Sequence, residues 1–178
     1  MTSRFRRFEP IDTARCRIRR FRPEDLEPFA AFMADTTATA YLPFPDEHKT
    51  RAGARQLLEA TLASYDSDRP MFALAVEART NGRFAGFCGV NPLDETTAEI
   101  MYAVIPGASG QGYATEIAAA LANFAIEKLG FRRLVAFIVP ANEPSKVVAA
   151  KAGFADEGLV EHANFSEKVH RFAYTPDL

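Results

Sequence analysis

Residues 98–116 constrain the fold and function of this chain more than any other stretch. An alternating, β-prone run through Ile100, Tyr102 and Val104 leads into a loop with two closely spaced glycines, and a helical pattern follows at once. A strand that runs through glycines into a helix presents several unpaired backbone N–H groups at one point. These groups and the helix dipole bind anions, above all phosphates. The stretch therefore predicts either a phosphate-binding loop or a turn that needs glycine only for its conformation.

Two common phosphate loops do not fit the spacing of Gly110 and Gly112. A nucleotide-binding P-loop ends in Gly-Lys-Ser/Thr, whereas Tyr113 follows the second glycine here. A dinucleotide-binding loop needs a third glycine where this chain has Thr115. It also needs a carboxylate at the end of the next strand, and residues 138–140 offer none. The sequence therefore argues against a kinase and against a dehydrogenase.

A third phosphate loop fits better, because the segment is similar to the pyrophosphate loop of the GNAT superfamily of acetyl-CoA-dependent N-acetyltransferases. That family carries Gln/Arg-x-x-Gly-x-Gly/Ala between a strand and a helix. Residues 109–114 read Ser-Gly-Gln-Gly-Tyr-Ala, with serine in place of the first Gln or Arg. The longer string at 110–116 resembles the RimJ/RimL-type branch, the ribosomal-protein N-terminal acetyltransferases. So do the segments at 13–19, 142–145 and 151–154, in the same order and spacing.

Strand and helix patterns alternate along the chain and predict an α/β protein with a mixed sheet. An Asn-Gly pair at 81–82 predicts a hairpin turn. Residues 134–139 are apolar throughout, as in a central strand that is covered on both faces. Pro144 suits the first turn of a helix. We expect the two last strands at residues 159–165 and 168–174.

The resemblance implies the GNAT fold, with about seven strands flanked by four helices. In that fold the strand before the glycine loop and the strand at 134–139 run parallel and separate, and acetyl-CoA lies in the gap. We expect residues 1–14 to form a leader and residues 15–178 to form a single acetyltransferase domain.

Composition sets limits on the function classes. The chain has 178 residues, of which 48% are hydrophobic and 25% are charged. Its net charge of −2 gives no general attraction to nucleic acid or to membranes. Cys16 and Cys88 form neither a disulfide framework nor a metal-ligand spacing, and no apolar run is long enough to span a bilayer. We therefore expect a cytoplasmic protein without a metal ion. The arginines between residues 4 and 22 are expected on the solvent face of an edge strand.

The resemblance also implies which residues hold the cofactor. Backbone N–H groups of the glycine loop would bind the diphosphate, and main-chain groups of the preceding strand would polarise the thioester carbonyl. Serine at position 109 removes a side-chain contact to phosphate, for which Lys146 or Lys151 could substitute. Asn142 would hold the pantetheine arm or a water, and it also suits a helix N-cap. The implied cofactor-binding residues are Tyr102, Ala103, Val104, Ser109, Gly110, Gln111, Gly112, Tyr113, Ala114, Asn142 and Ser145.

Two residues are candidates for the chemical step. Glu99 is the polar residue on the strand that leads to the cofactor, and it is either the base that takes the amine proton or an ordinary exposed strand residue. Many superfamily members use a tyrosine to protonate the departing thiolate, but Ala149 stands at that position. Ser145 matches the serine that the RimJ/RimL-type branch places near the sulfur. Tyr41 is expected near the acceptor.

The predicted function is direct transfer of an acetyl group from acetyl-CoA to a primary amine, which is either a protein N-terminus or a small molecule. The alternative is a non-catalytic acyl-CoA-binding sensor or interaction module on the same fold. No membrane, metal or specific nucleic-acid partner is expected, and the sequence leaves a homodimer open.

Overall fold

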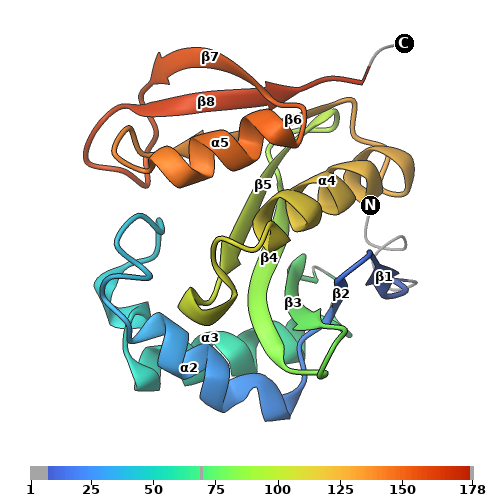
Figure 1. Cartoon of the computed structure of the whole chain (residues 1–178), viewed down its shortest axis with the longest axis vertical. Coiled ribbons are helices and arrows are strands. Elements are labelled where there is room, and N and C mark those ends of the chain that lie inside the picture. The colour runs from blue at the N-terminus through green and yellow to red at the C-terminus, as the bar shows by residue number, and fades with distance from the viewer. Residues whose placement is uncertain (1–7, 69, 177–178) are drawn as a thin grey trace.

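The computed structural model describes residues 8–68 and 70–176, which form an eight-stranded sheet with helices on both faces (Figure 1). The strand order is β1-β2-β3-β4-β5-β6-β8-β7. The strands are β1 (Ile11–Asp12), β2 (Cys16–Arg20), β3 (Ala73–Ala78), β4 (Phe84–Pro92), β5 (Thr97–Val104), β6 (Arg133–Ile138), β7 (Ala155–Val160) and β8 (Val169–Tyr174).

Helices lie against the middle and against both ends of the sheet. Figure 1 shows α4 across the middle of the sheet, α5 beside β6, β7 and β8, and α2 and α3 together at the other end. None of the helices in the described part of the chain is long and apolar enough to cross a membrane. The helical segments are η1 (Pro23–Asp25), α2 (Leu26–Met33), η2 (Asp46–His48), α3 (Arg51–Ser64), η3 (Pro106–Ala108), α4 (Tyr113–Glu127) and α5 (Glu143–Lys151).

The pairing of β5 with β6 is the feature of the sheet that shapes the site. These two strands are parallel, as predicted, whereas the other neighbours in the described sheet are antiparallel. The parallel ladder joins only Thr97–Glu99 to Arg133–Val135. Because β5 continues to Val104 and β6 to Ile138, the two strands separate after this short ladder. The backbone of β5 therefore keeps one edge without a strand partner beyond Glu99.

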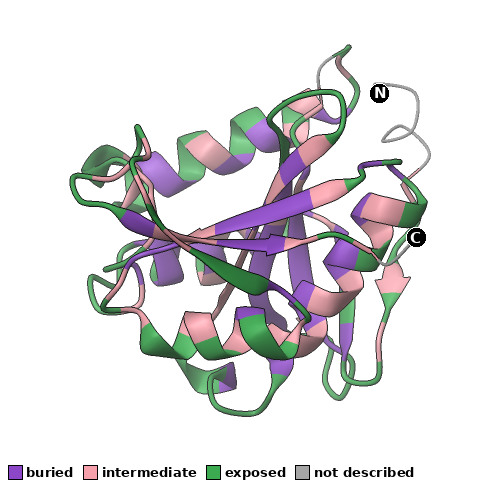
Figure 2. Cartoon of the chain, turned by 90° about the horizontal axis from the view of Figure 1, so that it is seen from above, coloured by how far each residue is buried: buried purple, intermediate pink, exposed green. Residues whose placement is uncertain are grey.

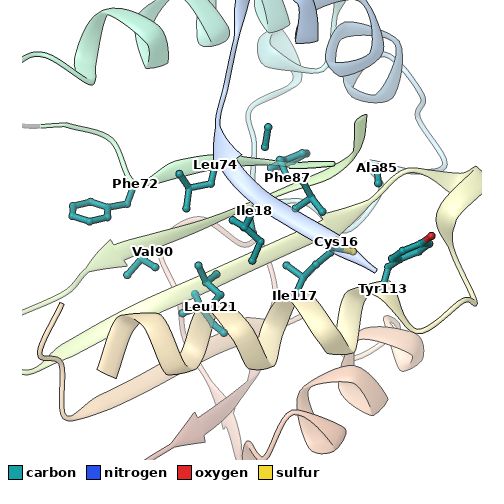
Figure 3. Packing of buried hydrophobic residues seen from close by; sticks show 14 of the residues in the cluster. Cys16, Ile18, Phe72, Leu74, Ala85, Phe87, Val90, Tyr113, Ile117 and Leu121 are labelled. Atoms are coloured by element: carbon teal, nitrogen blue, oxygen red, sulfur yellow. The ribbon is translucent and has the colours of Figure 1, made fainter. Parts of the chain in front are cut away.

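Apolar side chains fill both faces of the sheet, and Figure 2 shows the buried sheet enclosed by half-exposed helices. On one face, Leu121 of α4 packs against Ile18 of β2 (Figure 3). On the opposite face, Phe87 of β4 meets Phe29 and Phe32 of α2, with ring centroids 5.5 Å apart in both pairs. Burial of this kind stabilises by about 1.5–3 kcal/mol per large side chain. The rigid sheet that results supports β5 from both sides.

The prediction of a strand at residues 159–165 is wrong, since β7 runs earlier in the chain, over Ala155–Val160. This strand lies at the edge of the sheet and is largely exposed, so its side chains do not alternate between apolar and polar. Its pairing with β8 is also irregular between Asp156 and Leu159. Glu157 forms ion pairs with Arg133 (2.6 Å) and with Arg171 of the neighbouring strand (2.7 Å). Charges on an edge strand discourage pairing with other chains.

The N-terminal region carries more structure than its sequence indicates. The expected leader, residues 1–14, lies partly outside the described residues, and its described part contains β1, which pairs with β2. Arg4, Arg6 and Arg7 also lie outside the described residues. The solvent-facing role expected for the arginines is wrong for Arg19, whose buried guanidinium bonds Asp25 (2.8 Å) and whose Nε bonds a carboxylate of β3. Burial of that charge is offset because its hydrogen bonds are satisfied.

Candidate active site

The glycine loop delivers an uncapped helix start to the end of β5. Gly112 is the N-cap of α4 with φ of 80°, and Gly110 has φ of 74°, so both adopt the left-handed region that favours glycine. The N-caps of α3 and α5, Thr50 and Asn142, accept hydrogen bonds through their side chains from the first helical turn. Gly112 has no side chain with which to do so. The amides of residues 113–115 therefore keep neither an intrahelical partner nor a side-chain cap, which is the arrangement that binds anions.

Arg15, which directly precedes β2, anchors this loop through hydrogen bonds to Glu116 and to the Gln111 carbonyl. We call these contacts the Arg15 brace. The Arg15 Nε bonds Glu116 Oε2 (2.8 Å), its backbone N–H bonds Glu116 Oε1 (2.7 Å), and its guanidinium also donates to the carbonyl of Gln111. Thr13 donates a further hydrogen bond to the same carboxylate. Since a trans peptide points its C=O and N–H in opposite directions, holding the Gln111 carbonyl turns the Gly112 N–H away from Arg15.

The brace also controls charge at the start of α4. Burial opposes the ionisation of Glu116, but the hydrogen bonds from Thr13 and Arg15 together outweigh it and lower the pKa of this carboxyl. The carboxylate is therefore ionised and paired, and its charge is offset where an anion would approach the helix. The Arg15 guanidinium lies 5.3 Å from the centre of the Tyr113 ring, which is buried beneath it.

Gly112 leaves space that the Arg15 guanidinium occupies. A Cβ at this position would lie 2.9 Å from Arg15 Nη2, so the guanidinium would have to move. A Cβ at Gly110 would meet nothing within 4 Å. In the structure the nearest atoms around a Cβ at Gly112 belong to the brace.

A groove of about 880 Å³ runs from the glycine loop along the free edge of β5 to the start of α5. Of the two lysines considered for the missing side chain at position 109, Lys151 lines this groove, whereas Lys146 pairs with Glu143 (2.6 Å). Gln111 does not line the groove, and its Nε2 donates to the carbonyl of Gly107 (3.1 Å). The predicted residues that line the groove are Tyr41, Tyr102, Ala103, Val104, Ser109, Gly110, Gly112, Tyr113, Ala114, Asn142 and Ser145.

Ser145 lies beside the phenol of Tyr102, a contact that the sequence does not predict. The Tyr102 hydroxyl donates to the Ser145 carbonyl (3.2 Å), and the Ser145 hydroxyl donates to the Tyr102 oxygen (3.3 Å). Asn142 Oδ1 accepts a hydrogen bond from the Ser145 N–H (3.3 Å) and so caps α5. Burial raises the pKa of Tyr102, although its hydrogen bond with Ser145 opposes the shift. The phenol therefore stays protonated and able to donate over the physiological pH range.

A small cavity of about 60 Å³ lies in the gap between β5 and β6. Glu99 lines it at the last paired position of β5 and accepts a hydrogen bond from Asn91 Nδ2 (3.3 Å). Tyr102 and Ser145 line the same cavity and also the larger groove. Residues that bear the carboxylate and the hydroxyl pair thus line one space along the edge of β5, which holds a group the size of a water or an amine.

These features define a class of mixed α/β proteins in which a ligand groove opens between two separating parallel strands. A family profile described as "Acetyltransferase (GNAT) domain" matches residues 15–155. The chain belongs to this family of N-acetyltransferases, as the resemblance implied.

Similar proteins agree with this family. The uncharacterized N-acetyltransferase p20 of Bacillus licheniformis is 26% identical over 157 residues, which are 85% of each chain. A GNAT-family acetyltransferase from Bacillus anthracis superposes with a TM-score of 0.80 at 23% identity, over 94% of this chain and 98% of that one. RimJ of Mycobacterium smegmatis, solved in complex with CoA-disulfide, superposes with a TM-score of 0.75 at 21% identity, over 90% of this chain and 81% of that one. The two structures share the fold of this protein.

Replacing Arg15 with alanine is expected to weaken coenzyme A binding about tenfold, because the Gln111 peptide loses its anchor and the Glu116 carboxylate loses its partner. Adding Glu116→Gln to Arg15→Ala should recover part of the affinity, because it removes the unpaired negative charge. Arg17→Ala is the matched control, since Arg17 lies two residues further along, in β2, and pairs with Asp12. Titration calorimetry with coenzyme A measures all three variants. If wild type and Arg15→Ala bind coenzyme A with equal affinity, the Arg15 contacts do not support coenzyme A binding.

Proposed function

We propose that this N-acetyltransferase moves the acetyl group of acetyl-CoA directly to the nitrogen of a primary amine while both substrates are bound. One observation carries the proposal. The uncapped start of α4 and the Tyr102–Ser145 pair line one continuous groove, and that pair also lines the cavity that contains Glu99. A long anionic cofactor in the groove and a small amine in the cavity can therefore come together beside Tyr102 and Ser145, which line both spaces.

The diphosphate of the cofactor is assigned to the amides at the start of α4, with Lys151 beside it. The pantetheine arm lies along residues 102–104, where the free edge of β5 offers backbone donors and acceptors as a neighbouring strand would. A backbone N–H of this edge that is aimed at the thioester oxygen stabilises the developing oxyanion by roughly 3 kcal/mol in comparable enzymes.

The reaction then needs two proton movements. The amine nitrogen attacks the thioester carbon, the C–S bond breaks, and the acetyl group ends on nitrogen. Glu99 accepts the proton that the nitrogen loses. The departing thiolate receives a hydrogen bond or a proton from Tyr102, with Ser145 as the second donor. The phenol of β5 takes the place of the tyrosine that is absent at Ala149.

Tyr102→Phe is expected to lower kcat at least about tenfold, because a thiolate left without its donor is a poorer leaving group. The affinity for coenzyme A should change by less than about twofold, since the ring keeps its place in the groove wall. Tyr174→Phe provides the control, because this tyrosine packs against Phe154 outside the groove. Steady-state kinetics and calorimetry separate the two effects. If kcat of Tyr102→Phe equals that of wild type, the donor is another group.

The proposal as a whole is tested by thiol release from acetyl-CoA in the presence of a panel of primary amines, with calorimetry of coenzyme A in parallel. Amine-dependent thiol release together with an acetylated amine in the mass spectrum supports it. Tight binding of coenzyme A without turnover of any amine contradicts it and favours the acyl-CoA-binding sensor.

A further inference from the structure

A second cavity lies on the face of β5 opposite Tyr102, and we propose that it selects the acceptor. The structure assigns to it a primary amine carried on an apolar body, with no carboxylate next to the amine. This inference rests on the proposed function, because it names the substrate class of the same site.

Strand geometry connects this cavity to the chemistry. Successive side chains of a strand point to opposite faces, so Glu99 and Met101 lie on one face of β5 and Tyr102 on the other. The cavity has a volume of about 610 Å³ and is lined by both Glu99 and Met101. The same two residues line the small cavity between β5 and β6. An amine held at Glu99 therefore extends its substituent into the larger cavity, while coenzyme A approaches from the other face.

The walls of this acceptor cavity are mostly apolar. Phe72 is buried at its base, and Met71 is one of the exposed large hydrophobic side chains of the protein, at 39% exposure. An apolar substituent would cover this surface, and burial of apolar surface is what drives binding in such pockets. The apolar lining residues are Pro43, Phe44, Pro70, Met71, Phe72, Ala73, Val90, Pro92 and Met101.

The charges of the cavity argue for a cationic ligand group. Glu99 and the exposed Asp68 bring carboxylates to its lining, and Asn91 and Asn164 bring amides. Among the described residues that line it, there is no lysine, arginine or histidine. A free amino acid would place its carboxylate within a few ångströms of Glu99, and none of the described lining residues offers a cation to offset it. A polyamine would place any ammonium group that reaches neither Glu99 nor Asp68 against the apolar wall, where the loss of hydration is unfavourable.

Matched substrates test the inference. Phenylalaninamide and free phenylalanine have the same side chain and differ in the carboxylate, which also raises the pKa of the amine, so their kcat/KM values are compared per neutral amine. Glycinamide lacks the apolar body, and spermidine carries additional charges. We expect kcat/KM for phenylalaninamide to exceed that of each of the others at least about tenfold. A tetrapeptide that begins with phenylalanine carries the same chemistry on a polypeptide. The ratio of its kcat/KM to that of phenylalaninamide shows whether a peptide or a small amine is the better acceptor substrate.

A charge variant makes the test independent of the substrate panel. Met71→Lys places a cation in the lining. It should lower kcat/KM for phenylalaninamide and reduce the ratio of that value to kcat/KM for free phenylalanine. Leu159→Lys is the control, since Leu159 is also an exposed apolar residue but lies on β7, outside the groove and the two cavities described above. Calorimetry of both amines against the complex with coenzyme A reports the same preference without turnover.

The possible results distinguish a failure of the substrate inference from a failure of the proposed acetyltransferase function. Equal or better use of free phenylalanine, glycinamide or spermidine overturns the inference and leaves the acetyltransferase in place. Binding of coenzyme A with no acetylation of any amine overturns the proposed function. In that case the inference falls as well, unless calorimetry still shows phenylalaninamide bound in preference to phenylalanine.

Discussion

Gly112→Val is expected to raise the dissociation constant of coenzyme A at least about a hundredfold while the protein stays folded. A β-branched residue at φ of 80° is strained by about 1–2 kcal/mol. Its Cβ would also displace the Arg15 guanidinium, which lies 2.9 Å away. The turn must then re-form, and the amides at the start of α4 no longer converge on one point. Losing two charge-assisted hydrogen bonds, each worth about 1.5–3 kcal/mol, accounts for an effect of this size.

Gly82→Val is the matched control for this result. Gly82 also has a positive φ, of 67°, and lies in the hairpin between β3 and β4, where a Cβ would meet nothing within 4 Å. The same backbone strain should lower the melting temperature of both variants by a similar amount, and only Gly112→Val should lose affinity. Calorimetry and thermal denaturation provide the two readouts. A folded Gly112→Val protein with wild-type affinity would move the diphosphate site away from this loop.

Glu99→Gln is expected to lower kcat at pH 7 at least about a hundredfold, because general-base catalysis contributes about 10²–10⁴ to such reactions. The amide keeps the size of the side chain and can still bond Asn91, so the KM for acetyl-CoA should stay within about twofold of wild type. The difference from wild type should shrink as the pH rises toward the pKa of the amine, about 8 for an α-amino group, because solvent then removes the proton.

Glu95→Gln separates this effect from a general change of charge. Glu95 is exposed in the turn before β5 and lines none of the cavities described above. Its variant should keep the kcat and pH–rate profile of wild type. If Glu99→Gln keeps that profile as well, the base is another group or a water.

Local patterns were sufficient to predict the framework of the site. The strand–glycine–helix stretch and the apolar run at 134–139 each carry their signal within a few neighbouring residues, and both elements form where the sequence indicates. The family resemblance singled out Asn142 and Ser145, and the structure shows that Asn142 also caps α5 through the Ser145 N–H, three positions along the chain. The edge strand β7 was misplaced because exposed strands lack the alternation on which such predictions depend.

The long-range contacts of the site could not be derived in this way. Arg15 and Glu116 are 101 positions apart, and Tyr102 and Ser145 are 43 apart. The resemblance covered the segments that contain both pairs, but it assigned no contact between them.

The sequence by itself determined that a strand ends in a glycine turn and an uncapped helix, because backbone conformation and capping depend on adjacent residues. Only the tertiary structure decided what surrounds that turn. Separation of β5 from β6 opened the groove, the position of β2 brought Arg15 to the loop, and the packing of α5 on the sheet set Ser145 against the phenol of Tyr102. Such long-range contacts depend on how whole elements pack, and this packing is decided by the complete core rather than by any single segment.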